Sequence, residues 1–330
     1  MAYIMGVDGG NSKTYTVITD DKGNKLGEGL TGCGNHQVGL ERAMKNIESS
    51  IQQALKQADL KPSDIDFVQY GLAGADRETD LKILRPQLSQ LPFAKWDVVC
   101  DTMEGLRTGS PKNVGVVLIC GSGTNAAGRN FEGKTVQTGG FGYLYGDGRG
   151  VGGQSLAIEA FRAAIRSWEQ REEPTLLTET VPSFLGFDSV EAMFHGCLDQ
   201  GVTRIPADLS IILHDAAEKG DKVAIRILQE AGKELGMAAV SVIRRLGGFE
   251  GTVIPIVMVG SVVQKGRSPH LINATKAVIE KEGYAIKLRI PKMAPVYGAV
   301  LLGMDQLGIE VSQEVEEKFI QYGGYQDEKE

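Results

Sequence analysis

The sequence contains few cysteines and few aromatic residues. Only four cysteines and 6% aromatic residues occur among 330 positions. The cysteines, Cys33, Cys100, Cys120 and Cys197, form no C-x-x-C pair, and the four histidines add no zinc-binding spacing. A chain of this length can bury complete cores without disulfides or structural metals. We therefore expect reduced thiols and neither a disulfide framework nor a zinc site.

An excess of positive charge and a long apolar run are also missing. The chain has 35 Lys and Arg against 42 Asp and Glu, a net charge of −7. It therefore lacks the basic surface that binds nucleic acid or anionic membranes. The longest apolar runs, residues 114–120 and 253–263, are too short to span a bilayer. The first residues reach Asp8 without the basic region of a signal peptide. These features predict a cytoplasmic protein without nucleic-acid or membrane partners.

Glycine, in contrast, is abundant, with 43 residues gathered mainly in turns between apolar segments. The length predicts about two domains. Apolar periodicity predicts alternating strands and helices in the first third of the chain. The expected strands are residues 3–8, 14–19, 25–30, 65–72 and 96–100, and the expected helices are 40–58, 77–88 and 102–108. A hairpin turn is expected at residues 21–24.

The same order of strand, glycine turn, strand and hairpin begins again at residues 114–120. A shift of 112 positions places Asp8 on Cys120 and Gly9 on Gly121. This pattern predicts a duplicated α/β unit. The second half adds expected helices at 151–170, 189–198, 206–219, 222–246, 272–282, 294–307 and 312–322, and strands at 252–260 and 285–290. We expect one domain at residues 1–112 and a larger, more helical one at 113–311, with 312–330 packing back on the first.

The two glycine turns are candidate phosphate-binding sites. Glycines let backbone amides form an anion-binding nest, and Asp8 could hold Mg²⁺ through water. Taken alone, the first turn is more typical of an ordinary hairpin turn with a solvated Lys13, and it is not a Walker A motif. Two such turns at matching positions of a repeat could clamp a polyphosphate from both sides.

Asp101 follows an apolar strand, and ligands bind at the carboxyl ends of strands in open α/β sheets. A carboxylate at that position can accept a hydroxyl proton during phosphoryl transfer. The alternative is a helix N-cap.

The glycine-rich segment at residues 138–153 contains a formal G-x-G-x-x-G match at Gly148, Gly150 and Gly153. No apolar strand leads directly into it, so we do not interpret it as a dinucleotide site. It is more typical of a rigid loop that presents Asp147 before a helix.

Two smaller features remain open on the residues alone. Gly260-Ser261 follows an apolar strand and is either a nucleotide contact or an ordinary turn. Asn35-His36 lies on a glycine-flanked loop and is either a ligand contact or solvated. No Ser/His/Asp or Cys/His catalytic arrangement is apparent.

Taken in order, these motifs resemble a known family. The motifs are Gly6-Val7-Asp8-Gly9-Gly10, Asn35-His36, Gly71-Leu72-Ala73-Gly74-Ala75-Asp76, Asp101, Gly121-Ser122-Gly123-Thr124-Asn125, Gly139-Gly140-Phe141-Gly142, Gly146-Asp147 and Val259-Gly260-Ser261-Val262. The ordered set, over about residues 4–304, resembles the N-acetylglucosamine kinases and the wider BadF/BadG/BcrA/BcrD ATPase family. Those proteins belong to the actin-like, hexokinase and Hsp70 ATPase superfamily.

The resemblance implies two ribonuclease H-like (actin-like ATPase) domains, each a mixed sheet with flanking helices, hinged around a nucleotide cleft. It implies ATP and Mg²⁺ as cofactors, with Asp8 as the metal residue, acting through water. The implied phosphate-binding residues are Gly9, Gly10, Asn11, Ser12, Lys13, Thr14, Gly121, Ser122, Gly123 and Thr124. Gly260 and Ser261 would bind adenosine.

The resemblance also implies a sugar kinase in which Asp101 is the general base for the sugar 6-hydroxyl. The implied sugar-binding residues are Asn35, His36, Asn125, Gly139, Gly140, Phe141 and Asp147. Family members often carry Trp at the position of Phe141 and Glu at the position of Gly148. N-acetylglucosamine is the first candidate acceptor, because Asn35-His36 and Asn125 match the family pattern. The departures keep N-acetylmuramic acid and glucosamine open as alternatives.

Two other functions remain as alternatives to a sugar kinase. Activator ATPases of the same superfamily couple ATP hydrolysis to electron transfer through an iron–sulfur cluster held by cysteines, but the cysteine spacing here does not favour one. A non-catalytic sugar sensor would not need Asp8, Asp101 and both turns. The resemblance further implies a homodimer that acts on a small amino sugar.

Overall fold

The computed structural model describes residues 1–121, 123–140, 145, 151–266 and 268–323. The chain divides into two compact units. One unit consists of Met1–Gly115 together with the described residues from Pro291 onward, and the other is Val116–Ile290. Each unit contains one five-stranded sheet.

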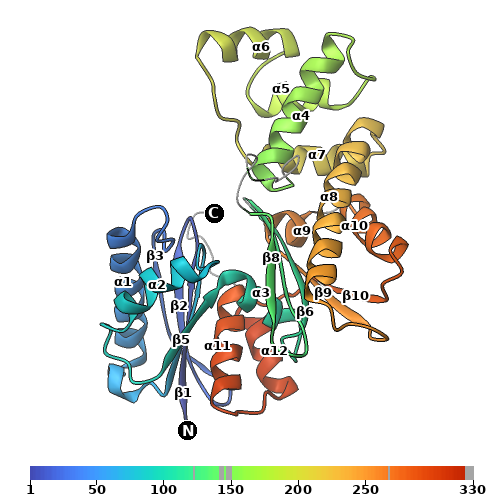
Figure 1. Cartoon of the computed structure of the whole chain (residues 1–330). Helices are drawn as coiled ribbons and strands as arrows, with labels where there is room; N and C mark the ends of the chain where they lie inside the picture. The colour runs from blue at the N-terminus through green and yellow to red at the C-terminus, as the bar shows by residue number, and fades with distance from the viewer. Residues whose placement is uncertain (122, 141–144, 146–150, 267, 324–330) are drawn as a thin grey trace. The chain divides into compact units, whose positions relative to one another are not determined.

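The sheet of the first unit has the strand order β3-β2-β1-β4-β5 (Figure 1). Strands β1, β2 and β3 pair antiparallel, whereas β1, β4 and β5 run parallel. The elements of this unit are β1 (Tyr3–Gly9), β2 (Thr14–Asp20), β3 (Lys25–Thr31), α1 (Leu40–Ala58), η1 (Pro62–Asp64), β4 (Phe67–Leu72), α2 (Glu78–Leu88), β5 (Trp96–Cys100), α3 (Asp101–Gly109), α11 (Pro295–Gln306) and α12 (Gln313–Tyr322).

Alternation along β1 places helices on both faces of this sheet. Met5 and Val7 pack in one cluster with side chains of α1 and α2, whereas Ile4 packs in another with side chains of α11 and α12. Gly6 shares the second face, where a Cβ would lie 2.7 Å from the Val296 carbonyl oxygen. Neighbouring residues of a strand point to opposite faces, so each face acquires its own core.

Helix α11 departs from the domain boundary expected from the sequence, which placed residues 113–311 in the second domain. In the structure α11 packs with β1, β4 and α3 of the first unit, and α12 follows it there. In Figure 1 both helices, in red, lie beside the blue strands. Gly298 and Gly303 allow this packing, because a Cβ at Gly298 would lie 2.1 Å from the Glu104 carbonyl oxygen. The small residues of this helix were visible in the sequence, but their partner was not.

The sheet of the second unit has the order β10-β9-β6-β7-β8, which matches the first strand for strand when read in reverse. The pattern-level repeat expected from the sequence is therefore confirmed. Its elements are β6 (Gly115–Cys120), β7 (Thr124–Arg129), β8 (Thr135–Thr138), α4 (Gly153–Trp168), α5 (Leu177–Phe184), α6 (Val190–Asp199), α7 (Leu209–Glu218), α8 (Lys222–Leu246), β9 (Ile254–Val259), α9 (Ser261–Lys265), α10 (His270–Lys281) and β10 (Ile286–Arg289). The first residue of β6 closes the first unit.

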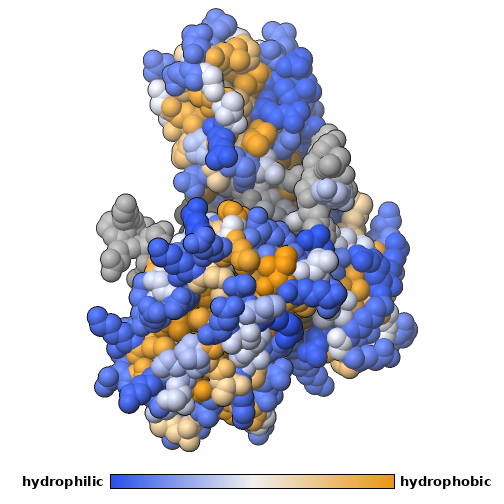
Figure 2. All heavy atoms as spheres, turned by 60° about the vertical axis from the view of Figure 1, so that its left-hand side comes forward, coloured by the Kyte–Doolittle hydropathy of each residue, from blue (hydrophilic) through white to orange (hydrophobic). Residues whose placement is uncertain are grey.

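Helices α5 and α9 were not expected from the sequence. Helix α5 has only eight residues and contains Pro182, and α9 has five. Segments this short carry too little periodicity to be recognised. None of the helices in the described part of the chain is long and apolar enough to cross a lipid bilayer. Hydrophilic residues cover most of the face drawn in Figure 2.

The packing of α1 on β3 yields a stability prediction. A Cβ at Gly29 would lie 2.0 Å from the Ser50 carbonyl oxygen, so Gly29→Ala forces α1 away from the sheet. We expect it to lower the free energy of unfolding by about 1–3 kcal/mol or more. Gln52→Ala, on an exposed position of the same helix, should stay within about 0.5 kcal/mol. Urea unfolding of both variants measures the difference, and equal stabilities would contradict the close approach.

Candidate functional site

Three parallel strands of the first unit bring chemistry-bearing residues to one edge of its sheet. Asp8 on β1 lies opposite Gly71 on β4, and Leu72 lies opposite Cys100 on β5. Asp101 follows Cys100 and is the first residue of α3, with Cys100 at the N-cap. Asp101 is therefore not the helix N-cap considered from the sequence. Because the carboxyl ends of these strands coincide, Asp8 and Asp101 face a common region.

Glu104, one turn after Asp101 on α3, was missed by the sequence analysis. It is fully buried, and its carboxylate lies over Gly71, where a Cβ would be only 2.0 Å from Oε2. Neither carboxylate oxygen makes a hydrogen bond of standard geometry with a described residue. Within the sequence Glu104 is one acidic residue among many. Only the glycine on the neighbouring strand shows why it can be buried there.

Burial raises the pKa of all three carboxyl groups of this cluster, and neighbouring negative charges add to the shift. Burial and then the Asp101 charge raise the pKa of Asp8 to about 6, while Glu104 and Lys13 oppose the shift. Burial, followed by the charges of Asp8 and Asp101, raises the pKa of Glu104 well above its usual value. Burial also raises the pKa of Asp101, against the opposing effect of the Cys100 thiol. Close like charges disfavour ionisation, so the cluster favours a nearby cation.

The Cys100 thiol is part of the same edge. Its Sγ donates to Asp76 Oδ1 at 2.9 Å and lies 3.2 Å from Asp101 Oδ1. Burial, together with the charges of Asp101 and Asp76, raises the pKa of Cys100 well above its usual value. Cys100 is therefore a protonated hydrogen-bond donor here and not a thiolate ligand.

The first glycine turn is closed by backbone hydrogen bonds. Gly10 N donates to Lys13 O at 2.8 Å, and Gly34 N donates to Gly10 O at 2.9 Å. Asn11 and Ser12 are exposed at the tip of the turn. Thr14, in contrast, is fully buried, and its hydroxyl donates to Gly32 O at 2.8 Å. The structure therefore gives the Thr14 side chain an internal role, whereas Asn11 and Ser12 lie at the surface.

Asn35 connects this turn to the loop predicted to hold the sugar. Its Nδ2 donates to Asn11 Oδ1 at 2.7 Å, and its Oδ1 accepts from Gln37 N at 2.8 Å. Asn35 is only 7% exposed. The two candidate sites of the first unit are thus one continuous hydrogen-bonded structure.

His36 is held by an acidic partner. Its Nε2 lies 3.3 Å from Asp80 Oδ1, and Asp80 also accepts from Arg77 Nε at 2.8 Å and Nη2 at 2.9 Å. His36 is buried. Its Nδ1 has no hydrogen-bond partner among the described residues. The loop is therefore anchored to the start of α2 through Asp80.

The second glycine turn lies in the second unit. Gly121 N donates to Gly123 O at 3.0 Å, and Gly153 N, at the start of α4, donates to Gly121 O at 2.7 Å. Gly260 has φ 113°, and a Cβ there would lie 2.4 Å from Cys120 O, so only glycine fits. The structure thus brings the predicted adenosine residue Gly260 against the turn.

A cavity of about 290 Å³ opens beside this turn. Its lining residues come from the turn, α4, α7 and α9 with its flank: Gly121, Gly153, Ala207, Asp208, Ser210, Ile211, His214, Asp215, Ser261, Val262 and Gly266. The predicted residue Ser261 is among them. The residues from α7 were missed, because a buried histidine on an apolar helix gives no sequence signal of its own.

Of the remaining predicted sugar residues, Asn125 lies on β7, and Gly139 and Gly140 follow β8. A Cβ at Gly140 would lie 2.9 Å from Asn125 Cγ, so these two residues are neighbours. Asn125 Oδ1 is buried and has no partner among the described residues. Gly139 O accepts from Gln137 Nε2 at 3.5 Å. Ser122, Phe141 and Asp147 lie outside the described residues.

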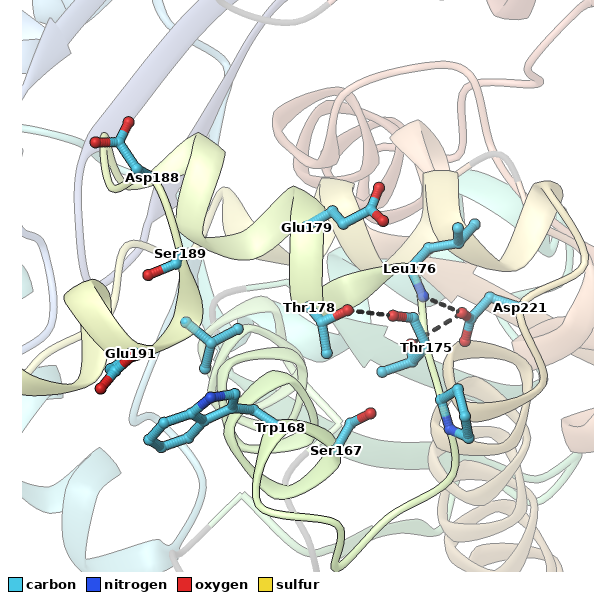
Figure 3. Close-up of a pocket in the computed structure, with 12 residues that line it drawn as sticks. Ser167, Trp168, Thr175, Leu176, Thr178, Glu179, Asp188, Ser189, Glu191 and Asp221 are labelled. Atoms are coloured by element: carbon cyan, nitrogen blue, oxygen red, sulfur yellow. Dashed lines mark hydrogen bonds between the residues drawn. The ribbon is translucent and has the colours of Figure 1, made fainter.

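A larger cavity, of about 860 Å³, lies among α4, α5 and α6 (Figure 3). Two of its polar groups have structural roles. Asp221 Oδ2 accepts from the Thr175 hydroxyl and from Leu176 N, and Ser189 Oγ caps α6 by accepting from Ala192 N. Its described lining contains Glu179, Asp188 and Glu191 but no lysine, arginine or histidine. This cavity does not suit a polyphosphate.

Comparisons with known proteins agree on one family. The model of the BadF/BadG/BcrA/BcrD ATPase family matches residues 5–303. An N-acetylmuramic acid/N-acetylglucosamine kinase from Clostridium acetobutylicum is 28% identical over 93% of this chain and 99% of its own. An N-acetyl-D-glucosamine kinase from Dictyostelium discoideum is 29% identical over 91% of this chain and 97% of its own.

A solved structure shows the same fold. A provisionally assigned N-acetylglucosamine kinase from Chromobacterium violaceum has a TM-score of 0.66 at 23% identity, covering 92% of this chain and 99% of its own. The predicted fold class, two mixed sheets with flanking helices, is confirmed.

The Asp80 contacts lead to a pH prediction. Hydrogen bonds from Arg77 lower the pKa of Asp80 to about 2. Because the pKa of Asp80 is lower in the folded state, its ionised carboxylate stabilises the protein fully at pH values above the unfolded-state pKa, near 4. This stabilisation is lost as the pH falls toward the folded-state pKa of about 2. We expect Asp80→Asn to cost about 1–2 kcal/mol at pH 7, reduced because Arg77 is exposed, and progressively less below pH 4.

Urea unfolding of the wild type and Asp80→Asn between pH 7 and pH 3 measures this difference. The control is Glu78→Gln, at an exposed position of the same helical turn, which should stay within about 0.5 kcal/mol. A deficit of Asp80→Asn that does not shrink with acidification would show that the Asp80 charge is not what stabilises the loop.

Proposed function

The chain belongs to the BadF/BadG/BcrA/BcrD ATPase family, and on that premise we propose that it is an ATP-dependent sugar kinase. It transfers the γ-phosphoryl group of ATP to the 6-hydroxyl of an N-acetylated amino sugar. N-acetylglucosamine is the first candidate and N-acetylmuramic acid the second, because the named relatives act on these sugars. The observation that carries the proposal is the placement of Asp101 beside Asp8, at the strand edge that also holds the glycine turn.

Asp101 would be the general base. As the sugar O6 bonds to the γ-phosphorus, the bond from that phosphorus to the β–γ bridging oxygen breaks and ADP leaves. The hydroxyl proton passes to the Asp101 carboxylate. Its raised pKa makes this carboxylate a stronger base than an exposed aspartate, which favours proton transfer near neutral pH. The Cys100 Sγ, which donates its proton to Asp76, lies 3.2 Å from Oδ1 of this carboxylate.

The acidic cluster fits a hydrated Mg²⁺ ion. Mg²⁺ keeps several waters in proteins and takes one or two carboxylates together with substrate phosphates. Among the described residues, no group of three or more His, Cys, Asp or Glu side chains is arranged to hold a metal directly. By the family resemblance Asp8 would hold the ion through water, and the ion would neutralise charge on the phosphates.

Asn35 suits a sugar contact. Its amide uses one N–H on Asn11 and one lone pair on Gln37 N, which leaves one donor and one acceptor position. The unpartnered Nδ1 of His36 and Oδ1 of Asn125 offer further polar atoms, each in its own unit. Polar atoms of this kind suit hydroxyl and N-acetyl groups.

An activator ATPase is the second interpretation within the family. Such proteins use cysteine thiolates as cluster ligands. Here burial raises the pKa of Cys120 to about 12, and its Sγ donates to Val151 O at 3.1 Å. Cys100 is likewise a protonated donor. Both thiols have hydrogen-bond partners within the protein, and the cysteine spacing of the sequence does not favour a cluster.

The decisive test is ADP release with Mg-ATP, measured with N-acetylglucosamine, N-acetylmuramic acid, glucosamine, glucose and a blank. We expect release to depend on one N-acetylated sugar, and kcat to fall about 10²–10⁴-fold in Asp101→Asn. Asp97→Asn, on the same strand but in a surface pair with Arg85, is the matched control and should retain kcat. ADP release with glucosamine alone would show that the acceptor is glucosamine and not an N-acetylated sugar.

Other outcomes of this assay contradict the proposal. Equal ADP release in every tube, blank included, would indicate an ATPase. Sugar binding without any ADP release would indicate a sensor. Near-normal turnover in Asp101→Asn would remove Asp101 from the role of base.

A second prediction concerns the sugar loop. Asn35→Ala should raise the KM for the sugar about 10-fold or more while changing the KM for ATP much less, because a ligand contact and one hydrogen bond to the turn are lost. The control is Asn46→Ala, whose Nδ2 donates to Cys33 O and supports the same loop from α1. Steady-state measurement of both KM values in the two variants distinguishes a sugar contact from simple support of the loop. Equal increases in both KM values in Asn35→Ala would indicate a general loss of loop structure instead.

A further inference from the structure

The cavity beside the second glycine turn contains a polar side chain that nothing in the proposed mechanism uses. His214 lies on α7, is 6% exposed and lines this cavity of about 290 Å³. That volume is at the lower end of the range for small-molecule sites, roughly 300–1,000 Å³. The cavity lies wholly within the second unit.

Neither ring nitrogen of His214 has a hydrogen-bond partner in the part of the chain that the structure describes. Buried polar atoms without partners are rare in native proteins, and each one calls for a physical explanation. Burial lowers the pKa of His214, against the opposing charge of Asp215. The ring is therefore neutral at pH 7, with one nitrogen as donor and the other as acceptor. A ligand in the cavity would supply the missing partners.

Glycine at position 266 makes room for the imidazole. A Cβ there would lie 2.9 Å from His214 Cε1 and 3.3 Å from Nδ1. Gly121 and Gly153 line the same cavity without side chains, and Ile211 and Val262 add apolar surface. Bare backbone and apolar side chains around one polar edge suit a flat heterocycle.

Two carboxylates in the described lining disfavour a phosphate as the partner of His214. Asp208 and Asp215 line the cavity, and its described lining contains no lysine or arginine. Two carboxylates would repel a phosphate group. Gly121, in contrast, belongs to the turn predicted to bind phosphate. A nucleotide would therefore place its phosphates toward Gly121 and its base toward α7.

We propose that His214 is a nucleobase-recognition residue, which hydrogen-bonds the heterocyclic base of the nucleotide in this cavity. The inference rests on the proposed function, which supplies ATP as the phosphoryl donor. It adds His214, on α7, as a residue specific for the base. The residues predicted to bind adenosine from the sequence were Gly260 and Ser261.

Calorimetric titration of the full-length protein with ADP tests this role. His214→Phe keeps the ring volume and removes both polar atoms, and should weaken ADP binding about 10-fold. His214→Gln keeps a donor and an acceptor and should recover part of that loss. Inorganic tripolyphosphate, which has no base, should bind the wild type and both variants equally. The control is His195→Gln, on an exposed position of α6, which should bind ADP as the wild type does.

The outcomes separate the inference from the proposed function. ADP affinity that is unchanged in His214→Phe, or lost more in His214→Gln than in His214→Phe, overturns the inference, because His214 would then serve only packing. A wild type that binds no ADP and releases none with any sugar removes the proposed function and the inference together. Thermal unfolding confirms that each variant is folded. If His214→Phe does not fold, His214→Leu replaces it in the same comparison with His214→Gln.

Discussion

The burial of Glu104 against Gly71 is the contact on which the first candidate site depends. No side chain larger than glycine fits on β4 at that point, since a Cβ would lie 2.0 Å from the Glu104 carboxylate. The contact holds α3 against β4 near the carboxyl end of that strand, and α3 begins with Asp101. From the other side α11 approaches the Glu104 backbone through Gly298. The position of the proposed base is therefore set by close backbone approaches at two glycines.

The same principle operates in the second unit, with different residues. Gly260 lies against Cys120 and Gly121 at a distance that excludes a Cβ, and Gly266 leaves space for the ring of His214. In both units glycine does more than form turns, because it lets a buried polar or ionisable side chain lie against bare backbone. Such a group is costly to bury without a partner. Where the protein nevertheless keeps such a side chain in a cavity or at a strand edge, a ligand that supplies the missing partner is the physical explanation.

Much of the architecture could be predicted from periodicity and turn chemistry. Helix α8 was predicted from its apolar periodicity with its observed bounds, Lys222–Leu246. In the structure Asp221 caps its start and Gly247 follows its end. The repeat was visible as an order of elements, and the matching strand orders confirm it. Short elements such as α5 were missed, because eight residues with an internal proline give no clear period. The place of α11 was also missed, since an apolar, small-residue helix fits any sheet face.

The sequence by itself predicted most of the elements, their order and the two glycine turns, because local propensity and apolar spacing are written along the chain. It made Asp8 and Asp101 candidates because each follows a strand, whereas Asn35 became one only through the resemblance to a known family. Only the tertiary structure decided that Glu104 joins the acidic cluster, that Thr14 faces inward, and that His214 lines a cavity. Each of these depends on contacts between residues far apart in sequence. A pKa shift, a buried hydroxyl and an unpartnered imidazole are properties of such contacts, and no local pattern encodes them.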